Sequence, residues 1–500
     1  MWLLNEITKF YSLIRNNIKG NIYRAIKSLY SKTWACVRIQ NSTFTDFFLT
    51  NTGVRQGDNL SPTLFALYIN DLVTELKNLG VGIEINNTMV SLLLFADDLV
   101  LISENEKDLQ LLLDKFGDWC EKWNVKVNES KSKIMHFRPK RYRATDYRFK
   151  YLNSELDFVR QYKYLGVMFN EHLTFEKCSE ILADAGGRAL GSIISKCKKL
   201  KDCSFRTFDK LYNAGVVPII DYGSATRGFK DYKCIDNLQN RAMRYYLGVN
   251  KFAPVIGIEG ETGSIPAKLR RYKSILSFWN RMIEMNENRL TKIIFEWDYH
   301  LQRNNWSCDT KNIFAKCNLA SKFERKEKCS VSDMISLLFF DDYKDNWAMK
   351  VQQKPKLRTY KLFKTDFNPE KYLFFNLPKH KRSILAQFRL GILPLNIETG
   401  RYKNVTDDKG QIRKQKPEER LCTLCAMGST EDEFHFLFDC ECYSSKRNTL
   451  LNKVSLQNRN FSSLSRSSKL EFLMKNSVNN LCNYLCASWE IRKELLFNKC

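Results

Sequence analysis

The stretch LLLFADDLVLIS, residues 92–103, places two adjacent aspartates, Asp97 and Asp98, among nine apolar residues. The apolar runs on both sides of the pair predict two antiparallel strands joined by a tight turn. Aspartate tolerates turn conformations, which accounts for one of the two residues without any further function. Two carboxylates at one hairpin tip repel each other unless a positive charge lies beside them, and a divalent cation would supply that charge. The pair therefore indicates either an ordinary turn or a metal site.

Hydrophobic periodicity predicts helices on both sides of this stretch. One is expected between Ser61, as its N-cap, and Gly80, and the other begins in the capping-box pattern that starts at Ser103. Further along the chain, residues 161–170 are expected to form a strand whose alternation breaks at Gly166.

The composition of the 500-residue chain indicates several domains and a polyanionic partner. Its 80 lysines and arginines exceed its 55 aspartates and glutamates, so the net charge is +25. The excess is spread along the chain, which favours a nucleic-acid partner. A basic protein without such a partner remains the alternative.

The cysteine usage and the absence of long apolar runs indicate an intracellular protein. No segment reaches the roughly 18–20 uncharged residues of a membrane span, and no secretory signal is evident, so no membrane partner is expected. The 16 cysteines are mostly scattered singly, which predicts reduced thiols in the nucleus, the cytoplasm or both. Residues 1–14 have apolar positions at helical spacing and predict an amphipathic helix.

Four stretches, in sequence order, resemble the blocks of reverse transcriptases of non-LTR (LINE-like) retrotransposons. They are GVRQGDNLSPTLFALYINDL (53–72), FADDLVLIS (95–103), VNESKSKIMHF (127–137) and YKYLGV (162–167). The resemblance implies an α+β right-hand polymerase fold with part of the fingers and palm, a mainly helical thumb and a small zinc-knuckle region. It also implies RNA-directed DNA polymerase activity, with an RNA template, a DNA primer or target and deoxynucleoside triphosphates.

The resemblance implies catalytic roles for three residues. Asp97 would be the carboxylate that binds Mg²⁺ or Mn²⁺, and Asp98 would be its neighbour, also at the metal, near the primer terminus. Divalent ions held in this way stabilise the attacking and leaving oxygens of nucleotidyl transfer. Lys131 falls where the family places a lysine near the triphosphate, as a charge stabiliser or proton donor. An exposed lysine at a strand end is the alternative reading of Lys131.

The resemblance also implies which residues contact the template, the nucleotide and the primer. Those expected at the template and incoming nucleotide are Arg55, Gln56 and Gly57, and those expected at the primer end are Tyr164, Leu165 and Gly166. Gly57 has a local reason as well, because a backbone without a Cβ can approach a base or sugar closely.

Polymerases of this family hold their metal ions with a further aspartate, on a strand upstream of the Gln-Gly block. Here residues 1–30 are expected to supply the intervening helix and residues 34–52 the strand pair, which would place the aspartate strand before Met1. We therefore expect an N-terminally truncated polymerase with little or no activity alone, because in-line transfer depends on fixing both ions.

A second motif, CTLCAMGSTEDEFHFLFDC, has the pattern C-x2-C-x9-H-x4-C. Its candidate zinc ligands are Cys422, Cys425, His435 and Cys440. A Cys pair at this separation forms a knuckle around zinc, which a later His and Cys complete as a tetrahedron. Cys442 could replace Cys440, although the His-x4-Cys interval favours Cys440. Non-LTR elements often end in such a motif, and its zinc would either grip RNA or target DNA or only order a small domain.

Basic residues around this motif are expected to contact phosphate groups. They are Arg401, Lys414, Lys416 and Arg420.

The motifs and helical periodicity predict four regions. They are partial fingers and palm in 1–170, a helical thumb-like region in 171–290, a basic helical or linker region in 291–380, and a region with the zinc motif in 381–500.

Three functions are compatible with these features. The first is a reverse transcriptase of a transposable element, and the second is a non-catalytic nucleic-acid-binding remnant that uses the basic thumb and the zinc motif. The third is a structural or interaction protein that binds no nucleic acid, and the net charge of +25 argues against it.

Overall fold

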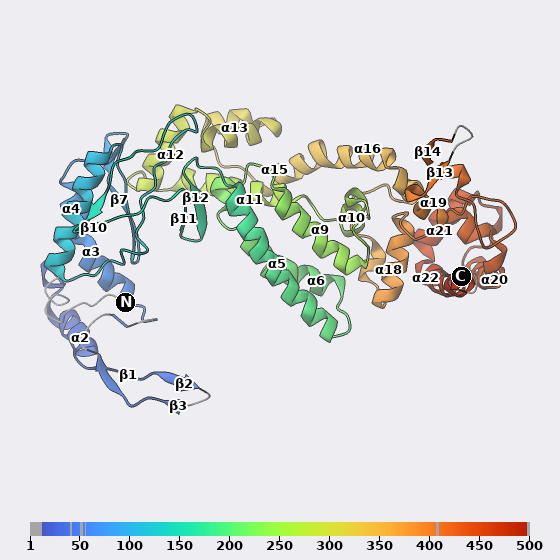
Figure 1. The fold of residues 1–500 in the computed structure, drawn as a ribbon, viewed down its shortest axis with the longest axis horizontal. Helices are drawn as coiled ribbons and strands as arrows, with labels where there is room; N and C mark the ends of the chain where they lie inside the picture. The colour runs from blue at the N-terminus through green and yellow to red at the C-terminus, as the bar shows by residue number, and fades with distance from the viewer. Residues whose placement is uncertain (1–12, 41–42, 51–53, 56, 407–409, 498–500) are drawn as a thin grey trace. The chain divides into compact units, whose positions relative to one another are not determined.

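The computed structural model describes residues 13–40, 43–50, 54–55, 57–406 and 410–497 (Figure 1). The chain divides into two compact units, of which the first comprises Met1–Phe175 and Met285–Gln302, and the second Glu176–Glu284 and Arg303–Cys500. The first unit mixes helices with hairpins, and the second is mainly helical, so the predicted α+β class is confirmed. The amphipathic helix expected for residues 1–14 lies largely outside the described residues.

The first unit combines helices with short antiparallel strand pairs. Its helices are α2 (Gly20–Ser31), α3 (Ser61–Lys77), α4 (Glu106–Trp123) and α12 (Leu290–Leu301). Its strands pair as β1 (Thr33–Ala35) with β4 (Phe48–Thr50), β2 (Arg38–Gln40) with β3 (Thr43–Phe44), β5 (Ile83–Ile85) with β6 (Thr88–Val90), β7 (Leu92–Phe95) with β8 (Asp98–Leu101), β9 (Lys150–Tyr151) with β10 (Ser154–Glu155), and β11 (Gln161–Tyr164) with β12 (Val167–Asn170). All of these pairs are antiparallel, and β1 to β4 form the strand pair expected from the sequence.

The two helices expected beside the aspartate pair are present, but their first residues differ from the prediction. Helix α3 begins at Ser61 itself, and the Ser61 hydroxyl donates a hydrogen bond of 2.6 Å to the carbonyl of Arg55 instead of capping the helix. Helix α4 is capped by Asn105, whose side chain accepts a 2.9 Å hydrogen bond from the backbone of Asp108. Ser103 instead donates to the carbonyl of Asn105.

The apolar faces of α3 and α4 form the core of the first unit. The buried side chains of this core that come from the two helices are Tyr68, Leu72, Leu76, Leu112, Leu113, Phe116, Trp119 and Cys120. The Tyr68 ring lies edge-on to Trp119, with centroids 5.9 Å apart. Leu92 at the start of β7 is buried in the same core, so the base of the aspartate hairpin is anchored by apolar packing.

The second unit is built from helices and one small hairpin. Its α-helices are α5 (Glu176–Lys199), α6 (Phe205–Gly215), α7 (Val217–Ile220), α8 (Ser224–Arg227), α9 (Lys233–Leu247), α10 (Val255–Thr262), α11 (Ala267–Glu284), α13 (Trp306–Lys316), α14 (Ala320–Glu324), α15 (Val331–Leu337), α16 (Asp345–Gln353), α17 (Tyr360–Phe363), α18 (Lys379–Arg389), α19 (Asn396–Thr399), α20 (Ser444–Gln457), α21 (Arg466–Asn476) and α22 (Val478–Phe497). Its 3₁₀ turns are η2 (Pro355–Leu357), η3 (Lys371–Phe374), η4 (Gly400–Tyr402), η5 (Pro417–Glu419), η7 (Glu441–Tyr443) and η8 (Phe461–Ser463). Two π-helical segments, η1 (Leu338–Lys344) and η6 (His435–Asp439), and the hairpin of β13 (Asn404–Thr406) and β14 (Ile412–Lys414) complete the unit.

Within this unit, α5 packs against α7 and α9, and α18 and α20 pack against α22. In the described part of the chain, no helix is both long and apolar enough to cross a membrane.

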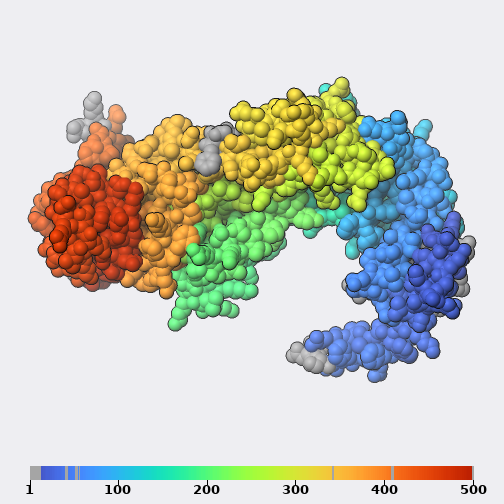
Figure 2. All heavy atoms as spheres, turned by 180° about the vertical axis from the view of Figure 1, so that it is seen from behind, coloured from blue at the N-terminus to red at the C-terminus, as the bar shows by residue number. Residues whose placement is uncertain are grey.

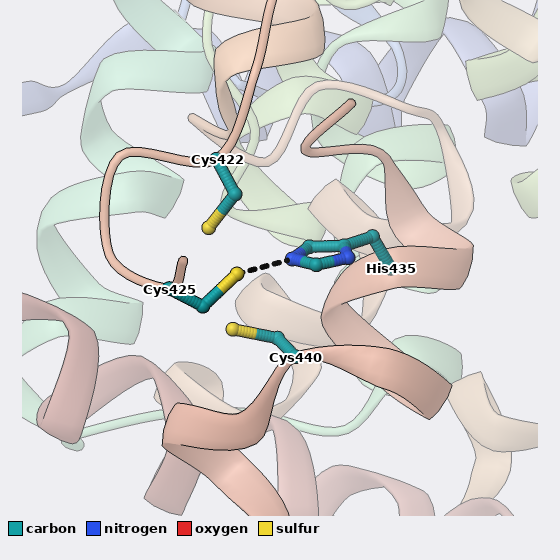
Figure 3. Close-up of side chains that lie close together, drawn as sticks. All are labelled: Cys422, Cys425, His435 and Cys440. Atoms are coloured by element: carbon teal, nitrogen blue, oxygen red, sulfur yellow. Dashed lines mark hydrogen bonds between the residues drawn. The ribbon is translucent and has the colours of Figure 1, made fainter. Parts of the chain in front are cut away.

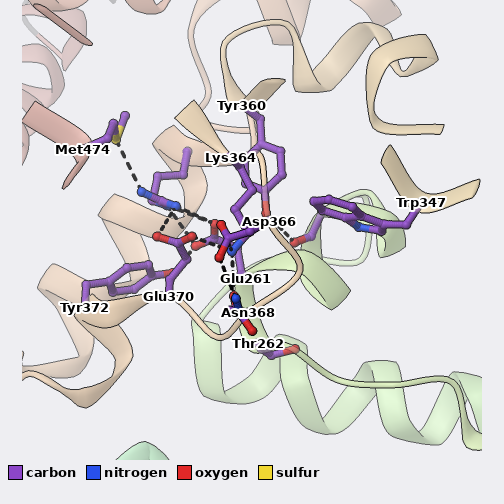
Figure 4. A network of polar contacts seen from close by, with 12 residues as sticks. Glu261, Thr262, Trp347, Tyr360, Lys364, Asp366, Asn368, Glu370, Tyr372 and Met474 are labelled. Atoms are coloured by element: carbon purple, nitrogen blue, oxygen red, sulfur yellow. Dashed lines mark hydrogen bonds and ion pairs between the residues drawn. The ribbon is translucent and has the colours of Figure 1, made fainter. Parts of the chain in front are cut away.

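A buried ion-pair network joins α10, α18 and the segment before η3 (Figure 4). The Arg389 guanidinium donates two hydrogen bonds of 3.0 Å and one of 2.9 Å to the Glu261 carboxylate, and it lies 2.7 Å from Glu370. Tyr372 donates a hydrogen bond of 2.6 Å to Glu261, and Lys364 lies 2.6 Å from Glu370. Burial acts to lower the pKa of Arg389, but the charges of Glu261 and Glu370 outweigh it and raise that pKa above its usual value.

Replacing Arg389 with methionine leaves the Glu261 carboxylate buried without its cation. We expect the free energy of unfolding to fall by about 3–5 kcal/mol, as is typical when one partner of a buried pair is removed. Urea unfolding of the full chain measures the loss. Lys475→Met, which breaks an exposed pair with Glu471, is the matched control and should change stability little. The double variant Arg389→Met/Glu261→Gln should lose less than the two single losses together, and strict additivity would contradict the coupling.

Glu259 on α10 is a carboxyl group whose pKa is raised by burial. Its carboxylate accepts a 2.6 Å hydrogen bond from Tyr343, and burial raises the pKa of Glu259 from 4.5 to about 7. Between these values the unfolded chain ionises Glu259 more readily than the folded chain, so stability is present at low pH and is lost as pH rises toward 7. We expect Glu259→Gln to remove about 3 kcal/mol of this pH dependence, measured by urea unfolding from pH 4 to 8. Identical pH profiles for the two proteins would contradict this assignment.

Candidate functional site

The aspartate pair lies at the tip of a hairpin with a two-residue turn, as the sequence predicts. Strands β7 and β8 pair in register from Leu92 opposite Leu101 to Phe95 opposite Asp98. Ala96 and Asp97 therefore form the turn, and Asp98 is the first residue of β8. Ala96 has a φ of 50°, in the left-handed region that costs a residue with a Cβ. Such backbone strain is found most often at functional sites.

The two carboxylates are exposed on a support that is held by the core. Asp97 and Asp98 are both exposed, whereas Leu94, Leu99 and Leu101 pack against the buried cluster of α3 and α4. The hairpin thus presents two acceptor groups to solvent on a short, anchored ribbon. Oxygen ligands of this kind suit Mg²⁺ together with substrate phosphates.

The stretch around Gly166 is a hairpin, and the prediction of one interrupted strand was wrong. Strands β11 and β12 pair with Tyr164 opposite Val167, which leaves Leu165 and Gly166 as a two-residue turn. Their φ angles are 45° and 82°. Two left-handed residues in succession match a type I′ turn, whose twist suits antiparallel strands. The Leu165-Gly166 pair was the sequence signal for this turn, but leucine is uncommon at its first position.

Two of the predicted site residues lie within electrostatic reach of each other. Burial, followed by the charge of Asp98, raises the pKa of Tyr164 on β11. Lys131 is exposed, and its backbone carbonyl accepts a 3.0 Å hydrogen bond from the Tyr162 hydroxyl on β11. The structure therefore connects three of the predicted blocks through one hairpin.

The block around Gly57 is attached to the end of α2. The Arg55 guanidinium donates a hydrogen bond of 2.6 Å to the carbonyl of Leu29, and it lies 5.5 Å from the Tyr30 ring centroid. Gly57 has a φ of 85°, and a Cβ built there meets no atom within 4 Å. Glycine is thus favoured by backbone conformation as well as by the expected approach of a ligand. Gln56 lies outside the described residues.

Within the described ranges, one group of at least three His, Cys, Asp or Glu side chains could hold a metal ion, and it is the Cys/His motif. The sulfurs of Cys422, Cys425 and Cys440 and a ring nitrogen of His435 all lie within 4.8 Å of one another. Figure 3 shows the four side chains converging, with the Cys425 sulfur 3.4 Å from Nε2 of His435. Three sulfurs and one imidazole are the donor set of a four-coordinate site for a borderline-soft metal ion.

Local backbone geometry explains the spacing of this motif. Cys440 donates its backbone N–H to the carbonyl of His435 at 2.8 Å, which is the i to i+5 bond of the π-helical segment η6. A π turn places residues five apart on the same face, so the His-x4-Cys interval aims both side chains at one point. On the other side, the backbone of Cys422 bonds to Ser429 at 2.8 Å, and Gly428 has a φ of 60°, which closes the knuckle loop.

Contacts within the group shift the pKa values of its side chains in opposite directions. The Cys440 thiol, hydrogen-bonded to the Cys422 sulfur, lowers the pKa of Cys422 to about 3, and the same contact raises the pKa of Cys440. The contact with Cys422 also raises the pKa of His435, and burial raises that of Cys425. Thiolates are the form in which cysteines bind metal, so a cation would take the place of the shared protons.

Buried charges that the sequence motif did not reveal support the cluster. Glu431 lies beneath Cys422 at 3.8 Å, accepts a 2.8 Å hydrogen bond from the backbone of Asn396, and forms an ion pair with Arg492 of α22. No sequence spacing links Glu431 to a residue 61 positions further on. The remaining thiol nearby, Cys442, points to the carbonyl of Leu424 at 3.4 Å and is not part of the group.

The basic residues expected to contact phosphates fall into two classes. Lys414 and Lys416 are exposed, and Arg401 is half-buried beside Glu398. Arg420 is buried, and its guanidinium donates to the carbonyls of Ile397 and Gln415, so its predicted role as a surface phosphate contact was wrong. The Arg420 side chain instead joins two backbone segments by hydrogen bonds.

Comparisons with known proteins agree with the hairpin and its neighbouring blocks. Residues 5–169 match the family described as reverse transcriptase (RNA-dependent DNA polymerase). The chain is 26% identical over 288 residues to the probable RNA-directed DNA polymerase from transposon BS of Drosophila melanogaster, which covers 53% of this chain and 31% of that protein. It is 30% identical over 132 residues to the RNA-directed DNA polymerase from mobile element jockey of the same species, covering 25% and 14%.

A shorter match of 84 residues is 40% identical to the retrovirus-related Pol polyprotein from type-2 retrotransposable element R2DM of Drosophila melanogaster, and it covers 17% of this chain and 8% of that protein. The matched segments thus span less than a third of the length of each of these three relatives.

Proposed function

We propose RNA-directed DNA synthesis as the function of this chain, whose residues 5–169 belong to the reverse transcriptase family and are related to the polymerases of non-LTR transposable elements. The observation that carries the proposal is the exposed Asp97–Asp98 pair at the tip of a hairpin whose base is anchored in the core. In the same turn, Ala96 has a φ of 50°, a conformation that is costly for a residue with a Cβ.

The residues of the first unit take the following proposed roles. Asp97 and Asp98 hold Mg²⁺ or Mn²⁺, which when bound supplies the positive charge that nucleotidyl transfer needs. Tyr164, with the β11–β12 turn of Leu165 and Gly166, supports the primer end beside these carboxylates. Lys131, whose backbone is tied to the same hairpin, reaches toward the triphosphate. Arg55, Gln56 and Gly57 are proposed to contact the RNA template and the incoming deoxynucleoside triphosphate.

The Cys/His cluster is proposed to bind Zn²⁺, because its donor set of three sulfurs and one imidazole suits a closed, four-coordinate zinc site. The supporting contacts of Glu431 and Arg492 fit a structural zinc, and the exposed Lys414 and Lys416 nearby fit contact with RNA or target DNA. We propose both a structural role and a nucleic-acid-binding role for the zinc, and separate measurements test the two.

We also propose a division of the chain into four regions. They are partial fingers and palm in residues 1–170, a thumb-like region in 171–290, a basic connecting region in 291–380 and the zinc-bearing region in 381–500. The boundary between the two compact units, at Phe175, supports the first division. The protein would act in the nucleus, the cytoplasm or both.

A non-catalytic role in nucleic-acid binding is the second candidate. It is favoured by the Cys/His cluster, whose assembly lies wholly within the second unit and does not require the aspartate hairpin. The expectation that the chain alone polymerises weakly stays a prediction.

Primer extension on an RNA template with Mg²⁺ or Mn²⁺ tests the polymerase. We expect extension by the full chain to be weak, and we expect Asp97→Asn to lower it about 100-fold or more because a metal ligand is lost. Asp146→Asn, at another exposed aspartate of the first unit, is the matched control. Equal extension by wild type and Asp97→Asn would contradict the proposed site, and strong extension by the wild type would contradict the expectation of weak activity.

If the wild type extends no primer, binding of labelled RNA separates the remaining functions. Salt-sensitive binding would support the non-catalytic role. No binding at low salt would leave only an interaction protein without a nucleic-acid partner.

Measuring the zinc content of the purified chain tests the metal assignment. We expect about one zinc per chain, and we expect Cys422→Ser to remove it and to lower stability by several kcal/mol, because metal binding contributes directly to folding. Cys442→Ser is the matched control, since its thiol points to the Leu424 carbonyl, and it should keep its zinc. RNA binding that survives zinc loss in a folded Cys422→Ser chain would assign the zinc a structural role only. Full zinc content in Cys422→Ser would reject the ligand set.

A further inference from the structure

Two aromatic side chains far apart in the sequence meet on the surface of the second unit. Phe252, in the loop between α9 and α10, is 54% exposed, and Tyr402, at the end of η4, is 56% exposed. Their ring centroids lie 6.0 Å apart at an interplanar angle of 46°. Single exposed aromatics are common and need no explanation. Two that are more than half exposed and in mutual contact form a small apolar platform.

The side chain of Lys356 contacts both aromatic residues. Lys356 Nζ donates hydrogen bonds to the carbonyl of Phe252 at 3.3 Å and to the hydroxyl of Tyr402 at 3.2 Å. It lies 5.9 Å and 5.8 Å from the two ring centroids. The buried carboxylate of Glu398, 2.5 Å from the same Nζ, fixes the lysine and also pairs with Arg401. The platform is therefore preorganised and not a chance contact of two flexible side chains.

The rim of the platform is basic. Lys251 is exposed and its Nζ lies 5.3 Å from the Phe252 ring. Lys414 donates a 3.3 Å hydrogen bond to the carbonyl of Tyr402, and the exposed Lys403 follows directly in the chain. Lys403 leads into the β13–β14 hairpin, which stands out from the surface of the second unit (Figure 2). Among the described residues around the platform, the Glu398 carboxylate pairs with Lys356 and Arg401.

Exposed aromatic rings with lysines around them can bind a single-stranded nucleic acid. Its unpaired bases stack on the rings, and its phosphates contact the lysines. Every nucleobase has a face that stacks on an aromatic ring, and lysines neutralise the backbone without reading its sequence. A duplex keeps its bases stacked on one another and offers no such face. A protein partner of mainly apolar character would gain little from the ring of lysines, so the charge favours a polyanion.

We propose that Phe252 and Tyr402 form a base-stacking platform for single-stranded nucleic acid, with Lys251, Lys403 and Lys414 contacting its phosphates. The inference rests on the proposed nucleic-acid function but requires no polymerase chemistry. It adds a contact site in the second unit that involves neither the aspartate hairpin nor the Cys/His ligands.

Fluorescence anisotropy with a labelled twelve-nucleotide oligo(U) tests the platform on the full chain. We expect the double variant Phe252→Leu/Tyr402→Leu to bind about ten-fold or more weakly at each salt concentration, because stacking is lost while the charge is unchanged. Phe497→Leu, at another ring that is 80% exposed, is the matched control and should bind like the wild type. The unfolding transition of each variant checks that the fold is retained.

A second probe separates stacking from charge. An abasic oligomer of the same length carries the same phosphates without bases, so wild type should bind it more weakly than oligo(U), and the double variant should show little preference. Lys251→Gln/Lys403→Gln should weaken binding of both probes and reduce the steepness of its salt dependence. The oligo(dT) counterpart reports whether the platform prefers RNA or accepts DNA equally.

Oligo(U) binding by Phe252→Leu/Tyr402→Leu equal to wild type would overturn the platform, as would equal wild-type affinity for the abasic and base-bearing probes. Loss of primer extension in Asp97→Asn with unchanged oligo(U) binding would concern the polymerase alone and leave the platform standing. No binding of any single strand by the wild type would overturn both the platform and the nucleic-acid function.

Discussion

The buried contact between Arg389 and the Glu261 carboxylate is the constraint on which the second unit depends. A guanidinium and a carboxylate that have both left water must stay paired, because either one alone would be a buried, uncompensated charge. This requirement fixes α18 against α10. Helix α18 packs on α22, and α22 carries the Arg492 that pairs with Glu431 beneath the Cys/His cluster. A line of packed helices and paired charges thus connects the core to the candidate zinc site.

The two candidate sites follow different physical designs. At the hairpin, apolar packing holds the base and leaves two carboxylates exposed, which suits the proposed sharing of a metal ion with a substrate. At the Cys/His cluster, three of the four side chains are buried, Cys425 is half-buried, and the buried Glu431–Arg492 ion pair lies beneath Cys422. The two candidate sites therefore differ in exposure: the aspartate pair faces solvent, whereas the Cys/His side chains are mostly buried.

The parts of the structure that depend on local sequence were predictable, and those that depend on distant partners were not. Periodicity located α3 and α4, and the apolar runs located the β7–β8 hairpin. The β11–β12 hairpin was missed because its turn places leucine, a poor left-handed residue, at the first position. Arg420 was expected on the surface because its charge was visible, whereas the backbone carbonyls that bury it come from the fold.

By itself the sequence determined the chemical groups and their local spacing: two adjacent carboxylates between apolar strands, and a Cys-Cys-His-Cys pattern whose final interval matches a π turn. Only the tertiary structure decided which distant groups meet these residues. It placed Tyr162 against Lys131, Glu431 under Cys422 and Phe252 against Tyr402. The physical reason is that short-range patterns set local backbone geometry, whereas contacts between remote side chains arise from packing that no spacing along the chain encodes.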